Sequence, residues 1–133
     1  FVDKTGALWF VSVGELHYIQ RDTFGAYDMQ THNIENVYPI YEDHEGVIWA
    51  GILRAELVSI SNSKAEVFNN MEAIPSNRFF SFLEDEANEM WMGTSVGLFK
   101  WDRKSNIKEV KPFEDTELKF VRGLIKDRNG SIW

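Results

Sequence analysis

Short apolar runs alternate with polar turns along the whole chain. Val37–Glu42 and Val47–Gly51 are rich in β-branched and aromatic residues, and the polar segment Asp43–Gly46 separates them. This pattern predicts a strand, a tight turn and a second strand. Two further strands are predicted over Leu57–Ile60 and Glu66–Asn69. No window shows a sustained helical apolar period with caps, so the chain is predicted to be all-β.

The same unit occurs four times. Tryptophans separated by 40, 42 and 42 residues mark it: Trp9, Trp49, Trp91 and Trp133. Six positions before each Trp stands an aspartate: Asp3, Asp43, Asp85 and Asp127. Three positions before each Trp stands a residue suited to a tight turn: Gly6, Gly46, Asn88 or Gly130. A regular period of this length indicates a repeat architecture.

Each position of the unit has a structural interpretation. The aspartate can accept hydrogen bonds from backbone N–H groups just after it, which favours a turn. Glycine takes a positive φ without steric cost, and Asn88 is the residue type that best tolerates this region after glycine. The tryptophan falls in the second strand and is predicted to pack between neighbouring sheets. The four aspartates are therefore interpreted as turn residues rather than as catalytic or metal-binding groups.

Four short antiparallel strands in roughly 42 residues are typical of a β-propeller blade. The fold prediction is a partial β-propeller of about three four-stranded blades, with a β-sandwich as the alternative. Residues 1–133 then form a segment of one propeller. Because closed propellers typically have four to eight blades, the remaining blades are expected either elsewhere in a longer chain or in a second copy that closes the ring as a dimer.

Composition and charge narrow the possible partners. Against 14 Lys and Arg stand 21 Asp and Glu, a formal net charge of −7. Without a basic patch, neither nucleic acid nor an anionic membrane surface is an expected partner. The chain has no cysteine, and its apolar runs are too short to span a bilayer. Phe1–Phe10 lacks the pattern of a signal peptide.

No catalytic, metal or cofactor site is predicted. His17, His32 and His44 are isolated in the sequence, and His44 lies in an Asp turn where solvent exposure is expected. Asp127–Gly130 begins like a calcium loop but lacks that motif's later acidic ligands. The aromatic residues Trp101, Phe79, Phe80 and Phe82 fit core packing better than sugar stacking.

Ligand binding in a propeller is expected on connecting loops. The Asp turns occupy one face, so the variable connections share the other. Arg54 and Glu56 depart from the small residues of the repeat, and nearby polar side chains suit a hydroxylated ligand. The candidate ligand-binding residues are His32, Asn33, Arg54, Glu56, Asn70, Glu72, Asn77 and Arg78.

The unit resembles the two-component regulator propeller repeat. That pattern runs Glu-Asp, two residues, Gly, one residue, then apolar-Trp-apolar-Gly-Thr, two residues and Gly-Leu. Residues Glu84–Leu98 depart from it only at Asn88, whereas the second unit has Ile52 and Glu56 in place of the Thr and the second Gly.

The resemblance implies a role in signalling. Such propellers form the periplasmic input region of bacterial hybrid two-component regulators, which commonly detect polysaccharide breakdown products. The implied function is a non-catalytic sensor segment, with an oligosaccharide as the ligand and a sensor histidine kinase as the parent protein. The alternative is a structural or protein-interaction scaffold that mediates dimerisation without a small ligand. Contact between this segment and the membrane is not expected.

Overall fold

The computed structural model describes residues 1–12, 15–28, 37–52, 56–62, 64–68, 71, 73–75, 78–111 and 117–133. These residues contain eleven strands. They are β1 (Leu8–Ser12), β2 (Glu15–Gln20), β3 (Thr23–Asp28), β4 (Val37–Glu42), β5 (Ile48–Ile52), β6 (Leu57–Ser61), β7 (Lys64–Phe68), β8 (Phe79–Glu84), β9 (Met90–Thr94), β10 (Leu98–Trp101) and β11 (Ile107–Val110).

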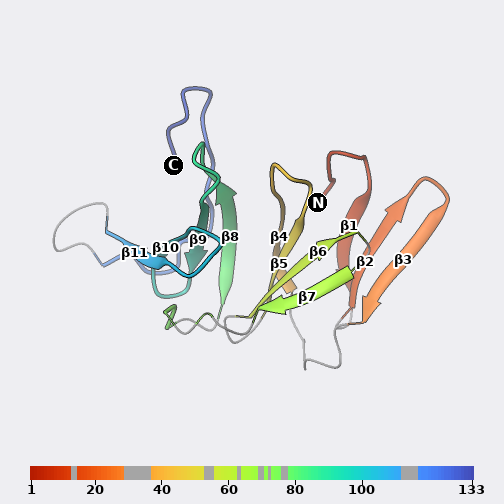
Figure 1. The fold of residues 1–133 in the computed structure, drawn as a ribbon, viewed down its shortest axis with the longest axis horizontal. Helices are drawn as coiled ribbons and strands as arrows, with labels where there is room; N and C mark the ends of the chain where they lie inside the picture. Colours follow the sequence, from red (N-terminus) through yellow and green to blue (C-terminus); the bar gives the residue numbers. More distant parts are fainter. Residues whose placement is uncertain are drawn as a thin grey trace.

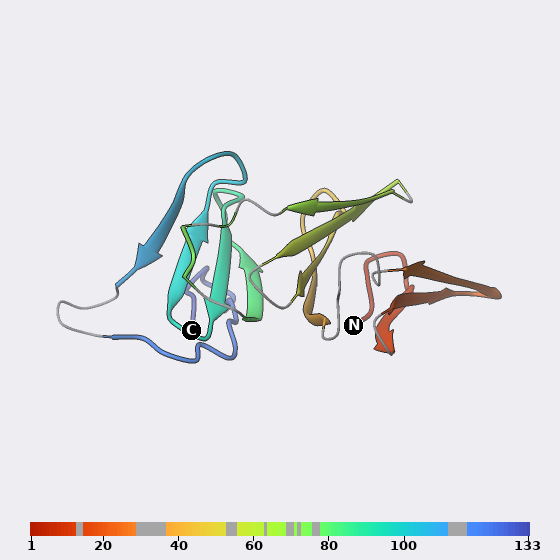
Figure 2. The same cartoon turned by 90° about the horizontal axis from the view of Figure 1, so that it is seen from below.

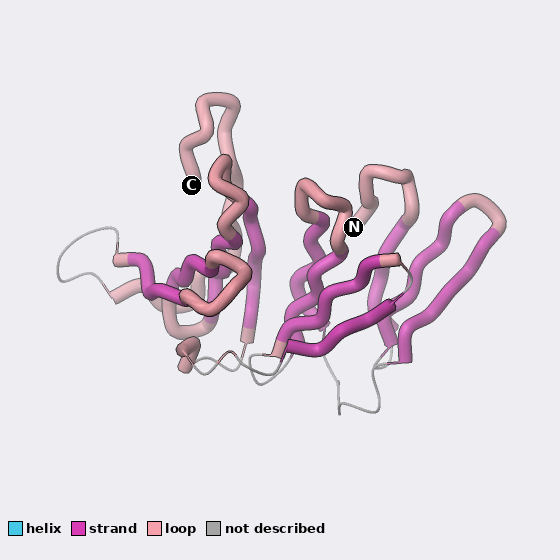
Figure 3. Tube along the Cα trace, viewed as in Figure 1, coloured by secondary structure: helices cyan, strands magenta, loops and turns pink. Residues whose placement is uncertain are grey.

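The strands form three separate antiparallel sheets, which stand side by side as blades (Figures 1 and 2). Blade 1 has the order β1-β2-β3, blade 2 β4-β5-β6-β7 and blade 3 β11-β10-β9-β8. Figure 3 shows strands and loops without a helix in the part that is described. The prediction of an all-β chain of propeller blades is confirmed. Within these ranges no helix could span a membrane.

Blade 1 has three described strands, where four were predicted. Val2 forms an isolated antiparallel bridge with Leu8, in the place of the missing first strand. A matching bridge joins Lys126 and Ile132 in the last unit. The turns that begin at the four repeated aspartates all point the same way, upward in Figure 1.

Two apolar clusters hold the blades together. The first joins blade 1 to blade 2 through buried residues that include Trp9, Leu16 and Val58. The second joins blade 2 to blade 3 and includes Trp49, Phe82 and Trp101. Burial of an apolar side chain of this kind contributes about 1.5–3 kcal/mol, so the contacts between sheets stabilise the array. Phe79 is also buried and Phe80 is half-buried, which agrees with a packing role for these aromatic residues.

Candidate functional site

Each repeated aspartate ties its turn together with one oxygen. The Oδ1 atom of Asp43 accepts the backbone N–H groups of Glu45 and Val47, both at 2.9 Å. The N–H of Gly46 donates to the carbonyl oxygen of Asp43 at 3.2 Å, and Gly46 has a φ of 81°. The same bonds form after Asp3, Asp85 and Asp127. The turn therefore needs a residue that tolerates positive φ at its fourth position, and Asn88 adopts a φ of 61° there.

The second oxygen explains the six-residue spacing. Asp43 Oδ2 accepts the indole Nε1–H of Trp49 at 2.8 Å. Equivalent bonds join Asp3 to Trp9 at 2.7 Å, Asp85 to Trp91 at 2.8 Å and Asp127 to Trp133 at 3.1 Å. One carboxylate thus fixes both the turn and the ring orientation in the second strand.

The four tryptophans differ in burial. Trp9 and Trp49 are buried, and Trp91 is half-buried. Trp133 is 73% exposed, and its packing between sheets stays a prediction. In the part of the chain that is described, no sheet covers its ring.

Backbone-to-side-chain bonds connect the first two Asp turns to the next blade. The N–H of Lys4 donates to Glu42 Oε2, and the N–H of His44 donates to Glu84 Oε2, each at 2.7 Å. Both glutamates directly precede a turn aspartate. In the last unit Lys126 takes that position, and its Nζ donates to the carbonyl oxygen of Glu84 at 3.3 Å.

A charged cluster lies between blades 2 and 3. Arg103, in the β10–β11 turn, donates from Nη1 to Asp43 Oδ2 at 2.9 Å and from Nη2 to Glu84 Oε1. The Arg103 side chain is 14% exposed, that of Asp43 0% and that of Glu84 6%. The Arg103 guanidinium also lies over the Trp49 ring, 5.8 Å from the ring centroid. Buried charges are tolerated only when paired in this way.

Blade 3 holds a second cation on a turn aspartate. Lys100 Nζ lies 2.9 Å from Asp85 Oδ2 and also pairs with Glu89. Burial acts to raise the pKa of Asp85, but hydrogen bonds from Lys100, Trp91 and two backbone N–H groups outweigh it and lower that pKa to about 2. The bonds to Glu89 and Asp85 raise the pKa of Lys100. Both groups are therefore charged at neutral pH.

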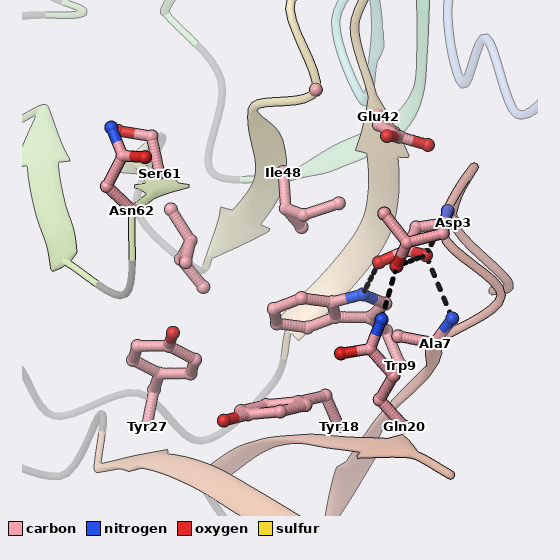
Figure 4. A pocket seen from close by; sticks show the side chains of 13 residues that line it. Asp3, Ala7, Trp9, Tyr18, Gln20, Tyr27, Glu42, Ile48, Ser61 and Asn62 are labelled. Atoms are coloured by element: carbon pink, nitrogen blue, oxygen red, sulfur yellow. Dashed lines mark hydrogen bonds between the residues drawn. The ribbon is translucent and has the colours of Figure 1, made fainter.

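A cleft of about 280 Å³ lies between blades 1 and 2, at the end of the sheets that carries the Asp turns (Figure 4). Trp9, Tyr18 and Tyr27 contribute aromatic rings to it, and the Trp9 and Tyr18 centroids are 5.2 Å apart. Its remaining lining residues are Asp3, Thr5, Ala7, Gln20, Glu42, Gly46, Ile48, Ile60, Ser61 and Asn62.

Asp3 is held as a carboxylate at the edge of this cleft. Burial acts to raise its pKa, but hydrogen bonds from Trp9, Thr5 and the backbone of Ala7 lower the pKa below its usual value. The Thr5 hydroxyl donates to Asp3 Oδ1 at 2.7 Å and accepts the Gln20 amide at 2.9 Å. The cleft thus combines a flat aromatic wall with carboxylate, amide and hydroxyl groups.

Most of the predicted ligand-binding residues lie outside the described residues: His32, Asn33, Arg54, Asn70, Glu72 and Asn77. Glu56 is half-buried, and its carbonyl oxygen accepts the N–H of Ile52 at 2.9 Å. Arg78 is exposed, and its carbonyl oxygen accepts the N–H of Ser95 at 3.2 Å. Whether these eight residues form one site stays a prediction.

Two of the three histidines are described. His17 is buried and stacks between Phe10 and Phe24. The side chain of His44 is 47% exposed, in agreement with its expected place at a solvated turn, and its Nδ1 lies 2.6 Å from Glu84 Oε1. Within the described ranges no group of three or more His, Asp or Glu side chains could hold a metal ion.

Sequence reasoning missed the residues between the blades. The repeat pattern predicts no contact of Arg103, Glu42 or Glu84 between blades, and the cleft lies on the Asp-turn face rather than on the opposite, variable face. The Glu-Asp pair that recurs at Glu42 and Glu84 was a usable signal for the contact between blades. Alignment of the third strands would have shown Arg103 at a position that holds Asn62 in the previous unit.

Solved structures of other proteins share the fold of this chain. Over its whole length the chain superposes on the extracellular domain of a putative hybrid two-component system from B. thetaiotaomicron, with a TM-score of 0.74 and 22% identity over 19% of that chain. It likewise superposes on virginiamycin B lyase from Staphylococcus aureus, with a TM-score of 0.77 and 16% identity over 46% of that chain. The chain thus spans less than half of either protein, and at these identities the likeness concerns the fold.

The sequence comparisons give one match, which covers a single segment of the chain. No curated protein matches the chain significantly. Residues 73–96 match the model of the two-component regulator propeller. This segment contains most of the unit in which the repeat pattern is best kept. The match confirms the resemblance of this chain to the two-component regulator propeller family.

Proposed function

We propose that this chain is a non-catalytic, ligand-binding segment of the sensor propeller of a two-component signalling regulator, outside the cytoplasm in the periplasm, and that it responds to an oligosaccharide. The observation that carries the proposal is the regulator-propeller match at residues 73–96 within an array of similar blades. The superposition on an extracellular domain of a hybrid two-component system supports the location. The ligand class follows from the family resemblance.

A glycan array followed by calorimetry on the purified protein tests the proposal. We expect saturable binding of at least one class of oligosaccharide. Alanine substitution of the predicted ligand-binding residues should weaken oligosaccharide binding. These residues are His32, Asn33, Arg54, Glu56, Asn70, Glu72, Asn77 and Arg78. Lys108→Ala, an exposed change on β11, serves as the control. An array without any saturable ligand would contradict the proposal.

The scaffold alternative has one observation in its favour. The face of blade 1 that points away from blade 2 carries Ile19 and Phe24, which are 40% and 62% exposed. Exposed apolar residues of this size on one sheet favour contact with another blade or a second copy. Light scattering, combined with the glycan-binding result, separates the scaffold from the sensor. A monodisperse dimer without glycan binding would favour the scaffold.

A further inference from the structure

The two interfaces between blades can be compared position by position. In the second strand–third strand pairing, Ile60 lies opposite Ile48 in blade 2, and Trp101 lies opposite Met90 in blade 3. Ile48 and Met90 each directly precede the repeat tryptophan. Two residues further along, Asn62 and Arg103 both adopt a positive φ, of 48° and 60°. Ile60 therefore corresponds to Trp101, and Asn62 corresponds to Arg103.

The residue types at these two positions determine whether side chains fill the interface between two blades. Between blades 2 and 3 the Trp101 ring packs edge-on against Trp49, with centroids 5.6 Å apart, and the Arg103 guanidinium lies over the same indole. Between blades 1 and 2 the shorter Ile60 and Asn62 line the cleft of about 280 Å³. The cleft thus occupies the place that an indole and a guanidinium fill in the neighbouring interface.

The carboxylates that bind the guanidinium are retained. Asp3 and Glu42 line the cleft at the positions that correspond to Asp43 and Glu84, the two partners of Arg103. Asp3 Oδ2 accepts the Trp9 indole N–H at 2.7 Å, as Asp43 Oδ2 accepts that of Trp49.

In blades 2 and 3 this second oxygen of the turn aspartate pairs with a cation, and both cations come from blade 3. Arg103 binds Asp43, and Lys100 binds Asp85. In blade 1 the position opposite the tryptophan is Tyr18, where blade 3 has Lys100. Of the described residues, no lysine or arginine lines the cleft. The nearby Lys4 instead directs its ammonium to the carbonyl oxygen of Asp43.

We propose that this cleft binds a small molecule that carries a guanidinium group, a role beyond the proposed oligosaccharide response. The guanidinium donates to Asp3 and Glu42 as Arg103 does to their counterparts, and charge-assisted bonds of this kind are the strong ones. Its flat face lies against Trp9 and Tyr18, where the ring quadrupole attracts a cation. The volume of the cleft limits the ligand to a short chain beyond the guanidinium.

Calorimetric titration of the purified protein with agmatine tests the site. We expect saturable binding, weakened roughly tenfold or more by Asn62→Arg, because the new side chain occupies the cleft. Arginine is compatible with the backbone at this position, since Arg103 and Arg21 have φ of 60° and 52°. Tyr18→Lys gives an independent check, since an ammonium on Asp3 would compete as Lys100 does on Asp85. Arg21→Asn, at the same turn position of blade 1 but outside the cleft, should bind normally.

Two further probes define the ligand chemistry. Putrescine, with an ammonium in place of the guanidinium, should bind roughly tenfold more weakly, because it lacks the planar fork of donors. Equal affinity for the two compounds overturns the guanidinium assignment. Tighter binding of N-acetyl-arginine amide than of agmatine assigns the cleft to a peptide side chain and overturns the small-molecule assignment. Absence of saturable agmatine binding, or unchanged binding by both cleft variants, overturns the site itself.

Discussion

Arg103 Nη1 donates to Asp43 Oδ2 at 2.9 Å across 60 residues of sequence. This bond joins the third-to-fourth strand turn of blade 3 to the Asp turn of blade 2. Because Asp43 also receives two backbone N–H groups and the Trp49 indole, a single carboxylate connects one turn, one strand and the next blade.

Removal of the Arg103 guanidinium should destabilise the array. Arg103→Ala leaves Asp43 and Glu84 buried without their cation, which is expected to cost about 3 kcal/mol in the free energy of unfolding. Urea denaturation followed by tryptophan fluorescence measures the change. Arg21→Ala is the matched control, since Arg21 is exposed at the equivalent turn of blade 1 and should change stability by less than about 0.5 kcal/mol. Equal effects would contradict the importance of the bond between blades.

The turn aspartates should differ in their contribution to stability. In Asp43→Asn an amide NH₂ replaces one oxygen and faces either backbone N–H groups or the donors of Trp49 and Arg103. The resulting unpaired buried donors are expected to cost about 2–3 kcal/mol. Asp127→Asn makes the same change where the indole partner is largely exposed, so its effect on the melting temperature should be clearly smaller. Comparable losses in the two variants would argue against burial as the cause.

The third turn tests the backbone requirement. Asn88 has a φ of 61°. In this region most residues that carry a Cβ are strained, but asparagine is tolerated. Asn88→Ala should lower the free energy of unfolding by about 1 kcal/mol. Asn88→Gly, which restores the residue of the other three turns, should be at least as stable as the natural sequence. Thermal denaturation of both variants decides, and a stable alanine variant would be inconsistent with this turn geometry.

Acid should remove the contribution of Asp85. Its pKa is about 2 in the folded chain, below an unfolded value of about 3.9, so the folded state binds its proton less readily. The stabilisation is complete above the unfolded pKa and is lost as the pH falls through about 2. Lys100→Met removes the largest hydrogen-bond contribution and should raise the pKa of Asp85. Carboxyl ¹³C NMR titration measures this pKa, and an unchanged value in Lys100→Met would contradict the assignment.

The local parts of the fold could be predicted from the sequence. The spacing of Asp43, Gly46 and Trp49 is fixed by hydrogen bonds within one hairpin, so it recurs in each unit and predicts the blades. The contact of Arg103 with Asp43 joins two blades and occurs once among the described residues. It therefore leaves no repeated pattern in the sequence from which it could be predicted. The cleft escaped prediction for a related reason: it exists because Ile60 and Asn62 are smaller than their counterparts, and a missing side chain leaves no motif.

Predicted ligand residues such as Arg54 and Asn70 are a different case. Arg54 departs from the repeat and Asn70 lies in a variable connection, and no repeated contact predicts the role of such residues. The turns and buried rings follow from hydrogen bonding and packing that every blade shares. A ligand site depends on side chains that differ from blade to blade, and it is therefore the part that a repeat pattern predicts least well.

The N–H to glutamate bonds from Lys4 to Glu42 and from His44 to Glu84 bear on how such an array grows. The second repeat carries both the donor for its successor, the N–H of His44, and the acceptor for its predecessor, Glu42, within three residues of sequence. A duplicated repeat would therefore arrive with both halves of the connection and could be inserted without new complementary mutations. Growth by whole repeats, with later replacement of single residues such as Asn62 or Arg103, would then open or fill individual interfaces while the array stayed intact.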